Sequence, residues 1–396
     1  MISKRLRASL DGAVCIRDIF EEGKKLAAIY GKENIFNFSI GNPNVEPPAI
    51  VNETLKEIIY TEEPLTLHGY PANVGHPDVR RCVANYLNTK FNMNYDETGI
   101  IMTSGAASAL AILCNTMLDQ GDEVVTFAPY FWEYKSYVET LYGKLVPALC
   151  DQQTLQPDPV TFEAALSPRT RMVFINNPNN PTGAVYTEES IKRVTEILER
   201  KQKEYGHPIY LVSDEPYRLL AYSGITVPWL PDFYKNTIVV YSYSKTLSIP
   251  GERVGYIAVG PDVDDFADLI AGVTASIRYL GYVNAPSLQQ RILLKCVDAS
   301  VDISIYEKNR DLLYKGLTDI GYDCIHPDGA FYLFMRSLEP DDAAFCEEAK
   351  KEKLLMAPGT AFYGPGFVRI SYCVPQDVIE RSLPAFKRLY DRYQNK

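Results

Sequence analysis

The chain has 396 residues, of which 46% are hydrophobic and 23% charged, with 40 basic and 50 acidic side chains. A chain of this length and composition folds into roughly two or three domains with large apolar cores, which excludes a disordered protein and a small disulfide-stapled fold. The formal net charge of −10 argues against nucleic acid as a partner, because clustered lysines and arginines supply much of the affinity for phosphate backbones.

The sequence predicts no membrane segment. The basic start at residues 1–12 is followed by a stretch that charges interrupt, so we expect no signal peptide. No later run approaches the roughly 20 apolar residues that span a bilayer. The cysteines form no CxxC pair, and we interpret them as reduced thiols of a cytoplasmic protein. They are Cys15, Cys82, Cys114, Cys150, Cys296, Cys324, Cys346 and Cys373.

Short β-rich runs alternate with helical patterns through the middle of the chain. This alternation predicts an α/β fold with a mostly parallel seven-stranded sheet and helices on both faces. A helix is predicted at 188–204, where apolar residues recur at helical spacing and Gly206 ends the run. The large domain is predicted at residues 47–290. Its predicted strands are residues 99–103, 123–127, 144–149, 172–176, 209–213, 237–242 and 254–259.

The pattern changes toward the end of the chain. A helical stretch near 287–320 is followed by short predicted strands and by an amphipathic helix from Pro375 onward. This mixture predicts a smaller α+β domain, formed by residues 291–396 together with residues 1–46, which also include an N-terminal arm. The short predicted strands are residues 322–325, 331–334 and 368–372.

The stretch YSYSKTLSIPGERVGY at residues 241–256 carries the strongest chemical signal. Lys245 lies just past a predicted apolar strand, with Ser242 before it and Arg253 after it. Ligands of open α/β sheets bind at the carboxyl ends of strands, and partial burial there disfavours the ammonium form and frees the amine as a nucleophile. For a lone lysine, a surface position after a strand is the alternative.

The stretch MTSGAASAL at residues 102–110 passes from a strand through one glycine into a helix of small residues. The backbone N–H groups of Gly105, Ala106 and Ala107 could face an anion there, with the helix dipole behind them. Beside Ser242 and Arg253, this turn would complete a phosphate-binding cup. Tight packing of small residues is the alternative explanation.

Two further strands end in polar residues. The stretch IYLVSDEPY at 209–217 ends in two carboxylates, and a carboxylate about 4 Å from a ligand cation interacts with it by roughly 4 kcal/mol at an effective dielectric near 20, before desolvation costs. That energy would keep a ring nitrogen protonated. A solvated turn acid is the alternative, which fits Glu215 better than Asp214. The stretch NNPNNPTG at 176–183 predicts either a rigid loop with a cis proline or a generic turn.

Together these four stretches resemble the pyridoxal-phosphate enzymes of the class I and II aminotransferase family, which have the aspartate-aminotransferase-like fold. The resemblance runs from Gly41 to Arg369, and residues 242–255 fit the family's lysine signature at every restricted position. It implies a pyridoxal 5'-phosphate-dependent aminotransferase, with no metal, that moves an amino group between an L-amino acid and a 2-oxo acid in a ping-pong cycle. It also implies a homodimer with active sites shared across the interface.

The resemblance also implies a role for each matching residue. Lys245 resembles the Schiff-base lysine, which is also the general acid and base, and Asp214 resembles the partner of the pyridine nitrogen. The donors to the cofactor's phenolic oxygen would be Tyr217 and Asn180. The phosphate cup would comprise Ser242, Arg253, Gly105, Ala106 and Ala107.

Four other positions complete the implied site. Tyr70 resembles the tyrosine that reaches the phosphate of the neighbouring subunit's cofactor, and Phe131 resembles the ring that stacks on the cofactor. Arg369 resembles the arginine that pairs with the substrate's α-carboxylate, and Gly41 the glycine whose backbone approaches it. The sequence departs from the commonest pattern at Ala107, where relatives often carry a side-chain donor. Trp132 is an alternative stacking group.

The substrate is less well defined by the sequence. Arg278 lies close to the position where dicarboxylate-specific relatives carry an arginine for the distal carboxylate, but a surface arginine fits the spacing equally well. Aspartate or glutamate is favoured as the donor, ahead of aromatic amino acids and alanine. The alternatives are a carbon–sulfur β-lyase on the same fold and, less favoured, a regulator that binds pyridoxal phosphate without catalysis.

Overall fold

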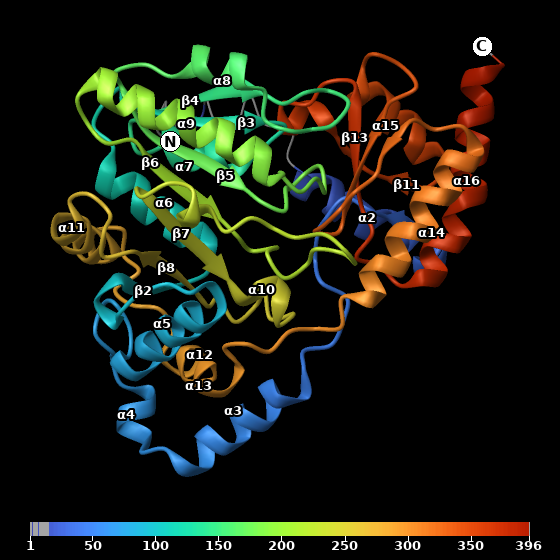
Figure 1. Cartoon of the computed structure of the whole chain (residues 1–396). Coiled ribbons are helices and arrows are strands. Elements are labelled where there is room, and N and C mark those ends of the chain that lie inside the picture. The colour runs from blue at the N-terminus through green and yellow to red at the C-terminus, as the bar shows by residue number, and fades with distance from the viewer. Residues whose placement is uncertain (1, 3–6, 8–15, 396) are drawn as a thin grey trace.

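The computed structural model describes residues 2, 7 and 16–395. A seven-stranded sheet is its largest sheet, and helices surround it (Figure 1). The strand order is β2-β8-β7-β6-β5-β3-β4; β8 is antiparallel to both of its neighbours, and the remaining pairs are parallel. The predicted fold class is confirmed. The strands are β2 Ile100–Thr103, β3 Glu123–Ala128, β4 Lys144–Leu149, β5 Thr170–Asn176, β6 Tyr210–Asp214, β7 Thr237–Ser242 and β8 Gly255–Val259.

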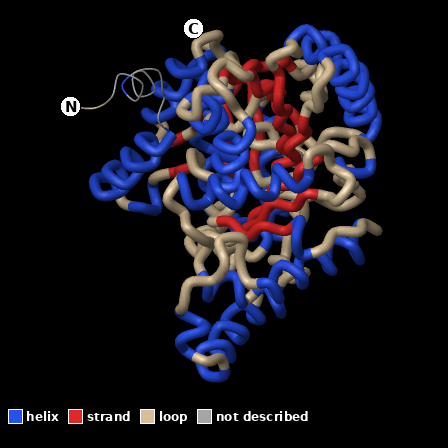
Figure 2. The backbone as a smooth tube through the Cα atoms, turned by 90° about the vertical axis from the view of Figure 1, so that its left-hand side faces the viewer, coloured by secondary structure: helices blue, strands red, loops and turns tan. Residues whose placement is uncertain are grey.

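Apolar cores cover both faces of this sheet. Successive side chains of a strand point to opposite faces, so Val124 packs in one core and Val125 in the other. The first core contains residues of α6 (Ala106–Met117) and α11 (Phe266–Tyr279), and the second contains residues of α8 (Pro159–Ala165) and α9 (Glu188–Tyr205). In Figure 2 the strands accordingly lie inside a shell of helices.

Helix α9 confirms the helix predicted at 188–204. Its N-cap residue Thr187 accepts a hydrogen bond from the Ser190 amide, and Gly206 ends the helix in the left-handed conformation, with φ of 74°. The buried face comprises Ile191, Val194, Thr195, Ile197 and Leu198.

The end of the chain forms a second, antiparallel sheet in the order β12-β13-β10-β9. Its core includes Phe38 from near the start of the chain, because the short strand β1 pairs in parallel with β11. The proposed domain limits, 47–290 against 1–46 with 291–396, remain a prediction. The strands of this sheet are β9 Cys324–Ile325, β10 Tyr332–Arg336, β12 Ala357–Pro358 and β13 Phe367–Ser371, and a separate two-stranded sheet consists of β1 Phe36–Asn37 and β11 Leu354–Leu355. The helices are α14 Ser304–Ile320, α15 Asp342–Lys351 and α16 Gln376–Gln394.

The helical stretch predicted near 287–320 consists of three separate helices. The chain forms α12 (Ser287–Arg291) and α13 (Leu293–Cys296), then leaves the helical path before α14. In this break the Val301 amide donates to the Thr246 carbonyl, and the Asp302 carboxylate accepts from the Ser304 amide. Serine and aspartate compete for backbone hydrogen bonds in this way and favour the ends of helices.

The remaining helices surround the sheets. Helices α3 and α4 extend to the end of the molecule farthest from α16 (Figure 1). Within the described residues, no helix is long and apolar enough to cross a membrane. The remaining helices are α2 Ile16–Tyr30, α3 Ala49–Thr61, α4 Pro64–His68, α5 Pro77–Phe91, α7 Glu133–Glu139 and α10 Tyr243–Thr246.

Candidate active site

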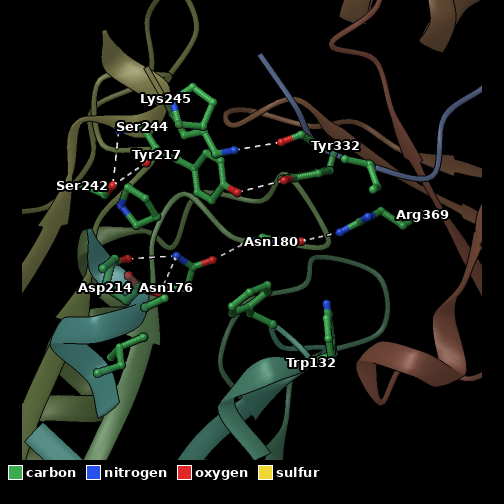
Figure 3. A pocket seen from close by; sticks show the side chains of 18 of the residues that line it. Trp132, Asn176, Asn180, Asp214, Tyr217, Ser242, Ser244, Lys245, Tyr332 and Arg369 are labelled. Carbon is green, nitrogen blue, oxygen red and sulfur yellow. Dashed lines mark hydrogen bonds between the residues drawn. The ribbon is translucent and has the colours of Figure 1, made fainter. Parts of the chain in front are cut away.

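A cavity of about 520 Å³ lies where β5, β6 and β7 end and β10 and β13 approach them (Figure 3). This is the edge at which open α/β sheets bind ligands. Residues of α2 also line it. The predicted site residues in its wall are Gly41, Ala106, Ala107, Phe131, Asn180, Asp214, Tyr217, Ser242, Lys245, Arg253 and Arg369.

Lys245 projects into this cavity from the short helix α10, directly after β7. Its Nζ donates a hydrogen bond to the Gly41 carbonyl oxygen at 2.8 Å. Burial lowers the pKa of the Lys245 amine to about 8, because the cavity wall replaces water around the ammonium. A substantial fraction of this amine is therefore neutral near physiological pH.

Asp214 is the last residue of β6, and its side chain is buried. Its Oδ2 accepts a hydrogen bond from the Tyr134 hydroxyl and a longer one, at 3.5 Å, from Asn176 Nδ2. Its Oδ1 is buried with no hydrogen-bond partner among the described residues. Burial raises the pKa of Asp214 to about 7, although the Tyr134 hydrogen bond opposes this shift. A cationic ring nitrogen would satisfy the free oxygen and keep the carboxylate ionised.

Glu215 is not the solvated turn acid that the sequence suggested. It is 1% exposed, forms a salt bridge with Arg218 and accepts a hydrogen bond from Ser213. Because neighbouring residues at a strand end point in opposite directions, Asp214 lines the cavity while Glu215 enters the core behind it.

The predicted phosphate cup comes together at the start of α6. Gly105 has φ of 81°, and a Cβ there would lie 2.7 Å from Arg253 Nη2. Arg253 donates to the Ser104 carbonyl at 2.9 Å and to Ser244 Oγ at 3.4 Å. Ser242 Oγ donates to Ser244 Oγ at 2.8 Å. A helix N-terminus, two hydroxyls and a guanidinium thus surround one position, which is a suitable site for a phosphate.

Arg369 lies in β13 and is buried. Nη1 donates to Asn180 Oδ1 at 3.0 Å and Nη2 to the Ser39 carbonyl, whereas Nε has no partner in the described part of the chain. The rings of Tyr332 and Phe362 lie 4.7 and 4.5 Å from its guanidinium carbon. Within residues 16–395, no salt bridge to a carboxylate is formed by Lys245, Arg253 or Arg369. Three cations at one cavity indicate an anionic ligand.

The remaining predicted residues lie elsewhere or stay ambiguous. Gly105 supports the cup without lining the cavity, and Tyr70 and Arg278 are exposed outside it. Phe131 and Trp132 both line the cavity, so the choice of stacking ring stays open. The peptide bond between Asn177 and Pro178 is cis, as the rigid-loop alternative anticipated.

Sequence analysis missed four polar residues at this site. Asn176 ends β5 directly beside Asp214 of β6, so the register of two parallel strand ends could have revealed it. Ser244 lies next to Lys245 in the strongest motif. Tyr134 and Tyr332 carry no local signal, because each reaches the site only through contacts distant in sequence.

The family comparison decides the interpretation of this geometry. The family described as "Aminotransferase class I and II" matches residues 33–386. The chain belongs to this family. It is therefore an aminotransferase, as the resemblance implied, and enzymes of the aspartate-aminotransferase type in this family use pyridoxal phosphate. The lysine, the free aspartate oxygen and the phosphate cup fit that cofactor.

Similar proteins agree with this assignment. The chain is 32% identical to a probable aspartate aminotransferase of Methanocaldococcus jannaschii, over 99% of this chain and 100% of the relative. It is 30% identical to the aspartate/prephenate aminotransferase of Thermus thermophilus, over 89% and 90%. The crystal structure of an amino transferase from Eubacterium rectale matches with a TM-score of 0.96 and 46% identity, over 99% of both chains. That of the Thermus thermophilus aspartate aminotransferase with maleate has a TM-score of 0.86, with 26% identity over 98% and 99%.

Proposed function

We propose that this enzyme transfers the α-amino group of an acidic L-amino acid to a 2-oxo acid in a ping-pong cycle. One observation carries the proposal: the cations Lys245 and Arg369 lie at the same cavity as the free oxygen of Asp214, without a carboxylate partner in the described residues. A cofactor ring and a substrate carboxylate together would satisfy all three groups.

When bound, pyridoxal phosphate supplies an electron sink for the charge that develops on the substrate's Cα. We assign Lys245 two tasks, holding the cofactor covalently and then moving the Cα proton as general acid and base. Its lowered pKa supports both, because a neutral amine can attack a carbonyl and accept a proton. Asp214 would hold a proton on the ring nitrogen, and Tyr217 and Asn180 would donate to the phenolic oxygen.

The phosphate would bind at the amides of Gly105, Ala106 and Ala107, with Ser242 and Arg253 beside them. Phe131 or Trp132 would stack on the ring. Arg369 would bind the α-carboxylate through its planar fork, with the Gly41 backbone beside it. An acidic side chain on the substrate is supported by the aspartate aminotransferases among the relatives and by the maleate complex of the Thermus thermophilus enzyme.

We also propose a cytoplasmic homodimer. Four large apolar side chains are each more than four-fifths exposed and lie on α3, α4, the loop after α4 and the end of α11; such exposure is typical of interface residues. They are Tyr60, Leu65, Tyr70 and Tyr279. Asn73 Nδ2 donates to the Val283 carbonyl, which joins the segment after α4 to the segment after α11. The cysteines among the described residues are free thiols, which supports a cytoplasmic location. Cys15 lies outside the described residues.

Amino-donor profiling tests the proposed function. Aspartate should convert to its oxo acid with 2-oxoglutarate as the acceptor, and glutamate should do so with oxaloacetate or pyruvate. Aromatic amino acids and alanine should react more slowly. A carbon–sulfur β-lyase would instead release pyruvate, ammonia and a thiol from a cysteine conjugate without any acceptor. Acceptor-independent pyruvate release with no transamination would overturn the proposal.

A further inference from the structure

Tyr332, the first residue of β10, lines the cavity and contacts both Tyr217 and Arg369. We call the part of the cavity around Tyr217 and Lys245 the cofactor half and the part around Arg369 the carboxylate half. Its side chain is buried, and its hydroxyl forms a 2.8 Å hydrogen bond with the hydroxyl of Tyr217 (Figure 3). The two rings meet edge to face, with centroids 5.7 Å apart. A residue of the second sheet therefore fixes the position of the Tyr217 hydroxyl.

The same ring contacts Arg369, in the carboxylate half of the cavity. The Arg369 guanidinium carbon lies 4.7 Å from the centroid of the Tyr332 ring. An aromatic face attracts a guanidinium electrostatically, and the attraction strengthens when water is excluded. Tyr332 thus fixes one face of the guanidinium, while Asn180 and the Ser39 carbonyl bind its edge.

The Tyr332 hydroxyl also packs against Gly41. A Cβ at Gly41 would lie 2.1 Å from Tyr332 Oη, so this close approach requires glycine. The carbonyl of Gly41 accepts the hydrogen bond from Lys245 Nζ. One phenol therefore contacts Tyr217, Arg369 and the glycine that accepts the Lys245 hydrogen bond.

We propose that Tyr332 is a positioning residue that couples the cofactor half of the site to the carboxylate half. Its hydroxyl would orient the Tyr217 O–H toward the cofactor's phenolic oxygen, and its ring would align Arg369 for the α-carboxylate. The inference rests on the proposed function, which assigns those tasks to Tyr217 and Arg369.

The direction of the hydrogen bond follows from the chemistry. If Tyr217 donates its proton to the phenolic oxygen, its own oxygen is free to accept, so Tyr332 must be the donor. Burial raises the pKa of Tyr332 to about 12, which keeps that proton in place at neutral pH. A bond accepted by Tyr217 strengthens the bond that Tyr217 donates, because chained hydrogen bonds polarise one another.

Two substitutions separate the two contacts. Tyr332→Phe removes the hydroxyl but keeps the ring beneath Arg369. We expect it to raise the pH midpoint of the visible absorption band of the loaded enzyme by roughly half a pH unit, because weaker donation stabilises the anionic phenolic oxygen less. The KM for the amino donor should stay within about twofold. Tyr332→Leu removes the ring as well and should also raise that KM roughly tenfold.

Tyr222→Phe is the matched control. Tyr222 is equally buried in the same core, and its hydroxyl bonds the Ala330 carbonyl and Tyr372 instead of a cavity residue. It should change neither the midpoint nor KM, although it removes a buried hydrogen bond. If Tyr332→Leu folds poorly, the melting temperature will reveal it, and Tyr332→Phe still provides the spectral test.

The outcomes distinguish the two proposals. A visible band in wild type, a raised midpoint in Tyr332→Phe and no change in Tyr222→Phe support the inference. A wild-type midpoint in Tyr332→Phe overturns it and leaves the aminotransferase proposal standing. A wild-type protein that forms no visible band with pyridoxal phosphate, or a Lys245→Ala variant that forms the same band, overturns the proposed function and this inference with it.

Discussion

Lys245 and Asp214 would both be charged in water, but burial drives each toward its neutral form. The pKa of the Lys245 amine falls to about 8 and that of the Asp214 carboxyl rises to about 7. Both shifts are caused mainly by desolvation, and the described residues give neither group an opposite charge in salt-bridge contact. Residues poised in this way are typical of active sites, where stability is given up for reactivity.

Lys245→Met should therefore stabilise the apoenzyme at neutral pH. Below pH 8 the folded chain buries a charged amine, at a cost on the order of 1–3 kcal/mol. Between pH 8 and the ordinary lysine pKa of 10.5, Lys245 binds more protons in the unfolded chain than in the folded chain, so its contribution to wild-type stability rises with pH. The melting temperature of the variant should exceed that of wild type at pH 7, and the difference should close above pH 10.5.

Lys144→Met is the control, because Lys144 is 66% exposed and pairs with Glu123 at the surface. Lys144→Met should not raise the melting temperature in a pH-dependent way. A difference between Lys245→Met and wild type that stays constant from neutral to alkaline pH would show that methionine packing, and not the removed charge, stabilises the variant.

At the scale of elements, the turn from β2 into α6 and the segment before β8 form the cup together. Gly105 adopts a conformation with positive φ that favours glycine, and Gly255 packs against it, since a Cβ there would lie 3.0 Å from the Gly105 Cα. β2 and β8 are adjacent antiparallel strands, with Thr103 opposite Gly255. Strand pairing therefore brings the helix N-terminus and Arg253 to the same side of the cavity.

Gly105→Ala should weaken pyridoxal phosphate binding roughly tenfold or more, because the added methyl group displaces the Arg253 guanidinium and a charge-assisted hydrogen bond is lost. Gly206→Ala is the matched control: it also has positive φ, but a Cβ there meets no atom within 4 Å. Both variants should lose stability, and only Gly105→Ala should raise the Kd in a titration of apoenzyme with cofactor. Equal Kd values for the two variants would contradict the assigned cup.

At the scale of the whole molecule, the cavity combines residues from both sheets, while Tyr70 lies outside it and is 91% exposed. In the proposed dimer, two-fold symmetry would carry Tyr70 of each chain to its partner's phosphate site. Each active site would then need two chains, which also explains why an aromatic side chain is left so exposed.

Subunit mixing tests this arrangement. Tyr70→Ala and Lys245→Ala, each poorly active at limiting pyridoxal phosphate, should complement when their subunits exchange. Half of the dimers would be mixed and would hold one intact site of two, so activity should approach roughly a quarter of wild type. Mixing Lys245→Ala with Arg369→Ala is the control, because both residues line the cavity of one chain and neither mixed site would be intact. No recovery in proven Tyr70/Lys245 heterodimers would place Tyr70 outside the partner's site.

The sequence by itself determined the mostly parallel sheet, the family and about half of the residues in the cavity wall. Those features depend on local patterns: apolar runs that end in polar residues, a glycine before a helix, and the lysine motif at 242–255. In a parallel sheet, all such strand ends meet at one edge, so local order along the chain is enough to assemble Asn180, Asp214 and Lys245.

The tertiary structure alone decided the contacts between distant segments. Tyr134 meets Asp214 across 80 residues, and Tyr332 meets Tyr217 across 115. The pleat, and not the residue type, directs Asp214 into the cavity and Glu215 into a buried pair with Arg218. The two-residue strands β1, β11 and β12 are too short to produce a pattern in the sequence. Such contacts depend on how whole elements pack, because a side chain's partner is set by the shape of the surface opposite it.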